Sequence, residues 1–166
     1  MIAKMIGAFC IFGASACIGF GKALELSRRT RYLQNLKTAF SILESEISFS
    51  ANSMQRAFSN ISRAVDTKGF LESVAQRTEE YGAREAWRMG VEENQMRLTP
   101  DDQEVLYAFG SELGMTDREN QVKNIRYITS LVEGQYERAE AERQKSARLY
   151  QSFGVLGGIF LVILFL

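Results

Sequence analysis

At 166 residues the chain allows one domain of ordinary size, and residues 22–148, between two apolar ends, are enough for a modest core. Twenty basic residues balance twenty acidic ones, which excludes the bulk positive field that nucleic-acid binding requires. Histidine is absent, which removes the commonest general base and the commonest metal ligand.

The first apolar segment, Met5–Gly21, holds 17 residues without a charge and predicts an N-terminal transmembrane helix at 1–22. Two alternatives are a signal peptide, because Lys4 precedes the apolar run, and a lipoprotein cleavage site ending at Cys17. A retained anchor is favoured because basic residues that follow such segments tend to stay in the cytoplasm. These residues are Lys22, Arg28, Arg29 and Arg31.

The residues between the apolar ends predict helices. The 3–4 spacing of apolar residues from Leu26 to Ile47 is typical of a coiled-coil-like stripe that packs on the chain's own helices. Further apolar patterns predict helices over 54–65, 70–82 and 84–96. The single tryptophan, Trp87, is expected in the core of this bundle.

The second half of the chain carries clear helix-start signals. Thr99 can cap a helix that has Pro100 at its first position and ends near Leu113, with Gly114 as its C-cap. The stretch from Thr116 to Glu119 is a capping-box pattern that opens a last helix, which would be roughly 75 Å long if it ran unbroken to Leu166.

The last apolar segment, from Phe153 to Leu166, follows a basic stretch and predicts a C-terminal transmembrane helix at 149–166. A re-entrant or interfacial segment is the alternative, because the run is short. Gly154 and Gly158 form a GxxxG pattern beside Gly157, which favours close packing against the first segment or against another chain.

These elements predict an all-α protein with a bundle of about six helices and a membrane-inserted helical segment at each end. The chain is therefore expected to comprise three parts: a transmembrane helix at 1–22, a cytoplasmic bundle at 23–148 and a transmembrane helix at 149–166.

Several stretches of the chain resemble the stage III sporulation protein AB family of endospore-forming bacteria. The most specific runs from Phe109 to Gln121, since helix periodicity does not demand its glycines and charges. The others are Leu33-x-x-Leu36, Leu43-Glu44-x-Glu46-Ile47, Glu85-Ala86-Trp87 and Tyr150-x-x-Phe153-Gly154-Val155-Leu156-Gly157.

The resemblance implies a subunit of the channel-like complex that links the mother cell to the forespore. Its soluble domain would be similar to the platform proteins of type II secretion and type IV pilus machines. The implied partners are a stage III sporulation protein AA-like ATPase, the other membrane subunits of the complex and the lipid bilayer, with no small-molecule substrate. The implied location is the mother-cell membrane around the forespore, with the central domain in the cytoplasm.

The Phe109–Gln121 turn is the candidate partner site, because its glycines allow close backbone approach and its charges lie at an exposed bend. The alternative interpretation is that its apolar members are core and its glycine and acidic residues are caps; both can hold together. The candidate residues are Phe109, Gly110, Leu113, Gly114, Asp117, Arg118, Glu119 and Gln121.

The sequence contains no cofactor or metal motif. It also contains no catalytic motif, because potential serine or lysine nucleophiles lack supporting partners. We therefore predict a non-enzymatic scaffold that docks an ATPase to membrane subunits. The alternative function is a lipoprotein or homo-oligomeric bilayer protein whose domain faces outward.

Overall fold

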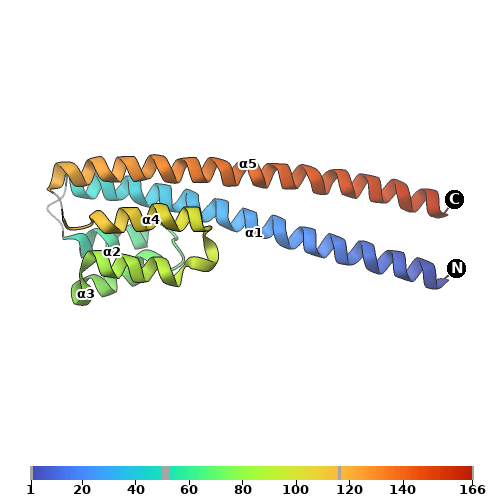
Figure 1. The fold of residues 1–166 in the computed structure, drawn as a ribbon, viewed down its shortest axis with the longest axis horizontal. Helices are drawn as coiled ribbons and strands as arrows, with labels where there is room; N and C mark the ends of the chain where they lie inside the picture. The colour runs from blue at the N-terminus through green and yellow to red at the C-terminus, as the bar shows by residue number, and fades with distance from the viewer. Residues whose placement is uncertain (1, 50–52, 116, 166) are drawn as a thin grey trace. The chain divides into compact units, whose positions relative to one another are not determined.

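The computed structural model describes the backbone of residues 2–49, 53–115 and 117–165, and the side chains of residues 21, 23–49, 53–95, 97–115 and 117–149. Every regular element in these ranges is helical (Figure 1), which confirms the predicted all-α class. In chain order the elements are α1 (Ile2–Phe49), α2 (Met54–Ala64), α3 (Phe70–Glu93), the short 3₁₀ helix η1 (Gln95–Arg97), α4 (Pro100–Glu112) and α5 (Arg118–Phe165).

The chain divides into two compact units, and both long helices contribute to each of them. The terminal unit comprises Met1–Thr30 and Arg138–Leu166, and the bundle unit comprises Arg31–Glu137. Both boundaries of the bundle unit, at residues 31 and 137, fall inside the expected domain 23–148. The limits of that expected domain come from the predicted membrane segments and not from packing. The division into 1–22, 23–148 and 149–166 therefore stays a prediction.

The core of the bundle unit is built around Trp87, which is 1% exposed, so its predicted core position is confirmed. Four phenylalanine rings, one from each of α1 to α4, lie with centroids 4.7–5.8 Å from the indole: Phe40, Phe58, Phe70 and Phe109. The indole Nε1 donates a 2.8 Å hydrogen bond to the Leu106 carbonyl oxygen, so this large side chain is buried without an unsatisfied donor.

Helix α1 brings its predicted apolar stripe into this core and pairs with α5 along its length in the bundle unit. Lys37 forms an ion pair with Glu133, and Glu44 accepts a 2.6 Å hydrogen bond from Arg126 Nε. Residue numbers rise on α1 where they fall on α5, so the two helices are antiparallel here. The residues of the stripe at 1–2% exposure are Leu33, Leu36, Phe40 and Leu43.

Helix α3 contains a chain reversal at Gly82, whose φ of 79° and ψ of 159° are not helical. The arms on either side pack against each other, since a Cβ placed on Gly90 would lie 2.7 Å from Val74 Cγ2. Arg77 and Glu93 add a 2.7 Å ion pair between the arms. In an unbroken helix, residues 74 and 90 would be about 24 Å apart.

The expected helices 70–82 and 84–96 are therefore two arms of one interrupted element. The described ranges hold five α-helices, of which α3 is two helices joined across the kink at Gly82, so the count differs only slightly from the predicted number of about six. The second arm also ends earlier than expected, because the Asn94 side chain turns back and donates a 2.9 Å hydrogen bond to the Gly90 carbonyl oxygen.

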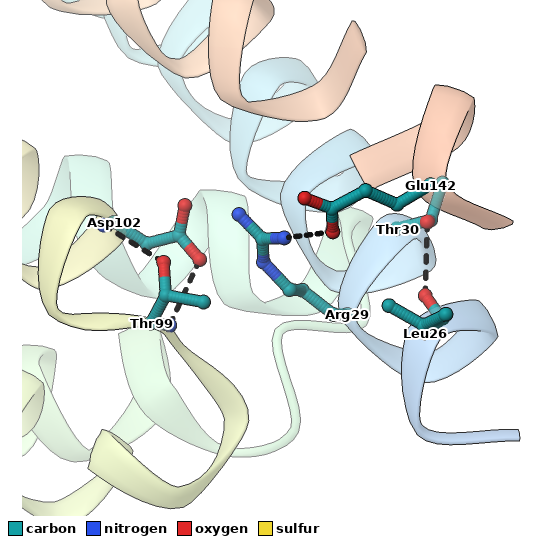
Figure 2. Close-up of polar contacts among 6 residues, drawn as sticks. All are labelled: Leu26, Arg29, Thr30, Thr99, Asp102 and Glu142. Carbon is teal, nitrogen blue, oxygen red and sulfur yellow. Dashed lines mark hydrogen bonds and ion pairs between the residues drawn. The ribbon is translucent and has the colours of Figure 1, made fainter. Parts of the chain in front are cut away.

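The start of α4 agrees with the predicted cap. Thr99 Oγ1 accepts a hydrogen bond from the Asp102 backbone N–H at 3.3 Å, and Asp102 Oδ2 accepts one from the Thr99 N–H at 2.9 Å (Figure 2). This reciprocal capping box, with Pro100 in the first turn, satisfies N–H groups that have no partner within the helix.

In the terminal unit, Arg29 Nη1 on α1 forms a 3.2 Å ion pair with Glu142 Oε2 on α5, and Thr30 Oγ1 donates to the Leu26 carbonyl oxygen at 2.9 Å (Figure 2). Thr30 and Ala139 are buried. A buried threonine whose hydroxyl bonds its own helix leaves no polar group unsatisfied.

In the described part of the chain, no helix combines enough length and apolar character to cross a bilayer. The side chains of the predicted membrane segments 1–22 and 149–166 lie, apart from Gly21 and Leu149, outside the described residues. The same is true of Gly154, Gly157 and Gly158. Membrane insertion and its packing glycines therefore stay predictions.

Candidate partner interface

The apolar half of the predicted site lies inside the bundle. Phe109 is 1% exposed and contacts Trp87, and Leu113 is buried where α4 ends. Gly110 lies against the indole, because a Cβ at this position would lie 2.6 Å from Trp87 Cδ1. For these three residues the core interpretation holds, and none of them is available to a partner at the surface.

The polar half lies at the surface where α4 leads into α5. Gly114 has a left-handed φ of 75° just after the C-cap of α4 and is exposed, as its predicted capping role requires. Asp117 Oδ1 accepts a 3.4 Å hydrogen bond from the Asn120 N–H and so caps α5. Thr116, the first member of the predicted capping box, lies outside the described residues.

The remaining predicted residues lie on the first turn of α5. Glu119 forms a 2.8 Å ion pair with Lys123 one turn later, and both side chains are well exposed. Gln121 is half-buried, and its N–H bonds the Asp117 carbonyl oxygen at 3.0 Å. Glu119 therefore offers accessible charge, whereas Gln121 offers little surface.

Arg118 has a contact that the sequence did not predict. Its Nε donates a hydrogen bond to the carbonyl oxygen of Ile47, in the last turn of α1. Carbonyl groups there have no intrahelical donor, so Arg118 caps α1 while it begins α5. One signal could have suggested this: a cation at a helix start opposes the helix dipole and needs a specific partner elsewhere.

Two large apolar side chains are exposed at the same end of the bundle unit. Phe49, the last residue of α1, is 88% exposed, and Met115, between α4 and α5, is 67% exposed. The Arg118–Ile47 contact brings the last turn of α1 beside the first turn of α5, at one end of the bundle unit (Figure 1). We call this the loop-end surface: Phe49, Gly114, Met115, Asp117, Arg118 and Glu119.

Several carboxylates that are not part of this surface have lowered pKa values. Arg88 lowers the pKa of Glu85, Arg77 lowers the pKa of Glu93, and Arg143 holds the pKa of Glu140 at about 2. An ion pair explains each shift, so none of these groups indicates an acid–base centre. The described residues include no cluster of three potential metal ligands.

Both the sequence and the fold of this chain are similar to those of known proteins. The family model described as stage III sporulation protein AB matches residues 4–166. Stage III sporulation protein AB of Bacillus subtilis (strain 168) is 28% identical over 169 residues, which cover 97% of this chain and 98% of that protein. A solved structure of a stage III sporulation protein AB covers 71% of this chain and 98% of its own, with a TM-score of 0.65 and 23% identity, and shows the same fold.

Proposed function

Because this chain belongs to the stage III sporulation protein AB family, we propose that it is a non-enzymatic membrane scaffold of a sporulation complex. In this function it docks a cytoplasmic ATPase, of the stage III sporulation protein AA type, to the membrane subunits. It acts in the mother-cell membrane around the forespore, with its bundle unit in the cytoplasm. The uncharged segment Met5–Gly21 and the apolar chain end support membrane anchoring.

The observation that carries the docking role is the loop-end surface. Phe49 and Met115 expose large apolar side chains that the bundle core does not use. Aromatic residues, methionine and arginine are enriched in protein–protein interfaces, and exposed apolar side chains ringed by polar groups mark such surfaces. Asp117 and Glu119 supply the polar surroundings. A partner that offers an apolar pocket with basic groups at its edge would fit this surface.

The experiment measures binding between the purified ATPase and the full chain in detergent. Replacing Phe49 and Met115 together by alanine should weaken binding at least about tenfold, because such residues form the energetic centre of interfaces. Since both side chains are mostly exposed, the midpoint of thermal unfolding, followed by Trp87 fluorescence, should stay unchanged. Arg118 is less suitable for this test, because its replacement also removes the cap of α1.

The matched control is Leu24→Ala, which removes a half-exposed apolar side chain 25 residues before Phe49 on the same helix α1. It should leave the affinity unchanged. If the Phe49/Met115 variant binds the ATPase as tightly as the unaltered chain, docking at this surface is wrong.

A further inference from the structure

The two units of the chain carry opposite formal charges. The terminal unit, Met1–Thr30 and Arg138–Leu166, holds eight lysine and arginine residues but three aspartate and glutamate residues, a charge of +5. The bundle unit, Arg31–Glu137, holds the other twelve basic and seventeen acidic residues, a charge of −5. The zero net charge of the whole chain is therefore the sum of two opposite charges, and the basic terminal unit attracts anionic ligands.

Helix α5 has a hollow in its surface within the terminal unit. Five residues line it, and they recur at helical spacings of three and four, which places them on one side of α5. We call this the terminal hollow: Ala141, Gln144, Lys145, Arg148 and Leu149. All five residues are exposed, so the hollow is open to the surroundings of this part of the helix.

The acidic residues of the same helix segment do not neutralise Lys145. Glu142 forms a 3.2 Å ion pair with Arg29 of α1 (Figure 2), and Glu140 forms a 2.6 Å ion pair with Arg143. Both acidic side chains that α5 contributes to the terminal unit therefore already have basic partners. Among the described residues Lys145 takes part in no ion pair, so its charge is available to a ligand.

An exposed apolar side chain lies one turn from this lysine, toward the chain end. Leu149 is 50% exposed, begins the predicted membrane segment 149–166 and lies about 6 Å along α5 from Lys145. Helix α1 repeats this arrangement with Leu24, which is 45% exposed and lies four residues from the exposed Arg28. Each helix therefore places a leucine toward its apolar chain end and a cation one turn further from that end.

This arrangement matches the order of groups in a phospholipid. With the segment 149–166 in a bilayer, Leu149 lies at the edge of the hydrocarbon, and Lys145 and Arg148 lie among the headgroups. Cationic side chains form strong hydrogen bonds with phosphate oxygens. The tendency of basic flanks to stay in the cytoplasm depends on how many basic residues are present, and does not require them to share one side of the helix with a leucine.

We propose that the terminal hollow binds an anionic phospholipid of the surrounding bilayer. Lys145 and Arg148 contact its phosphate, and Leu149 lies against the start of an acyl chain. A lipid with net negative charge is selected, because a zwitterionic headgroup carries a cation of its own that these side chains repel. The inference rests on the membrane anchoring of the proposed function, but not on ATPase docking.

The experiment identifies the lipid beside the terminal hollow of the full chain in vesicles. Leu149→Trp places a fluorescent reporter there, and brominated acyl chains quench it at short range. Vesicles hold equal amounts of phosphatidylglycerol and phosphatidylcholine, with one of the two brominated in each preparation. Quenching should show at least about a threefold preference for phosphatidylglycerol. Trp87, buried in the bundle unit, gives a background that is measured in the chain without the reporter.

Charge removal tests whether the preference belongs to the hollow. In the reporter chain, Lys145→Gln with Arg148→Gln should reduce the preference to about one, and Lys145→Arg alone should keep it. The matched control is Arg56→Gln with Arg84→Gln, which removes two exposed cations from the bundle unit and should leave the preference unchanged. About 1 M salt should weaken the preference, because it shortens the screening length to about 3 Å.

Three results would overturn the proposal, and they differ in what else they overturn. Equal quenching by both lipids, in a chain that floats with the vesicles, refutes lipid selection alone and favours an acidic segment of another protein as the ligand. A preference that the bundle control lowers as much as the hollow variant does refutes binding at the terminal hollow. A chain that does not float with vesicles refutes membrane anchoring as well. No ATPase is present, so none of these results bears on docking.

Discussion

Gly110 shows how closely the bundle is packed at single residues. A side chain there would enter the space of the Trp87 indole, at 2.6 Å from Cδ1. We therefore expect Gly110→Ala to destabilise the bundle unit by about 1–3 kcal/mol, which is typical of overpacking in a filled core. Trp87 is the only tryptophan and lies at this contact, so its fluorescence reports the unfolding midpoint directly.

Ser111→Ala is the control for this prediction, because Ser111 lies on the exposed side of the same helix and its hydroxyl bonds only the helix's own backbone. It should change stability by less than about 0.5 kcal/mol. A Gly110→Ala chain as stable as Ser111→Ala would show that the indole moves aside without cost.

The same residue shows where sequence-based prediction stops. The sequence indicates that Gly110 permits a close approach, which the structure confirms, but the group that approaches is Trp87 of the chain itself. These residues are 23 positions apart, and periodicity does not predict which side chains meet across helices. The sequence also left open whether Phe109 and Leu113 contact a partner or the core, because their helical spacing fits both positions. The structure buries both side chains in the core.

Glu93 makes stability depend on pH. Arg77, and to a smaller extent Ser73, holds the pKa of Glu93 below its ordinary value of 4.5. A lowered folded-state pKa means that the ion pair stabilises the folded chain above about pH 4.5 and that this contribution is lost as the pH falls through the folded pKa. The difference in unfolding midpoint between the unaltered chain and Glu93→Gln should therefore shrink between pH 7 and pH 3.

Glu104→Gln, on the exposed face of α4, controls for the loss of one surface charge. A midpoint difference for Glu93→Gln that is the same at pH 7 and at pH 3 would contradict the role assigned to the Arg77–Glu93 pair.

At the scale of elements, Gly82 decides how α3 folds back on itself. Its φ of 79° with ψ of 159° belongs to a region that is essentially restricted to glycine. Gly82→Ala should therefore destabilise the bundle unit by about 1–3 kcal/mol and loosen the contact between Gly90 and Val74. Gln76→Ala, in the exposed part of the first arm, should stay within about 0.5 kcal/mol. Equal midpoints for the two variants would show that the turn tolerates a side chain.

Element boundaries were the most predictable part of this fold, because they rest on local chemistry. Thr99 and Pro100 predict the start of α4, and Gly82 marks the end of an apolar pattern where the chain does reverse. The return of the second arm onto the first was not predicted, since it depends on which side chains fit against Gly90. The Arg118–Ile47 contact was missed for the same reason, as it joins positions 71 residues apart.

At the scale of the whole molecule, the antiparallel pairing of α1 and α5 determines where the chain enters and leaves the bundle unit. The Lys37–Glu133 and Arg126–Glu44 contacts fix this pairing. Residues 31 and 137 therefore lie toward one end of the unit, and the loop-end surface lies at the other. If both apolar segments cross a bilayer, the two chain ends lie on the same side of it, opposite the bundle unit.

This arrangement gives a topology prediction that separates the two candidate functions. A single cysteine replaces Ser111, which is exposed on α4, in a chain without Cys10 and Cys17, and a second version carries its cysteine after Leu166. When the chain is produced in vegetative cells, so that the far side of its membrane faces the medium, an impermeant thiol reagent should label the C-terminal cysteine but reach position 111 only after permeabilisation. The basic flanks of both apolar segments give this direction, because they tend to remain in the cytoplasm. Labelling of position 111 from outside would place the bundle unit across the membrane from any cytoplasmic ATPase, and would favour an outward-facing lipoprotein or bilayer protein instead.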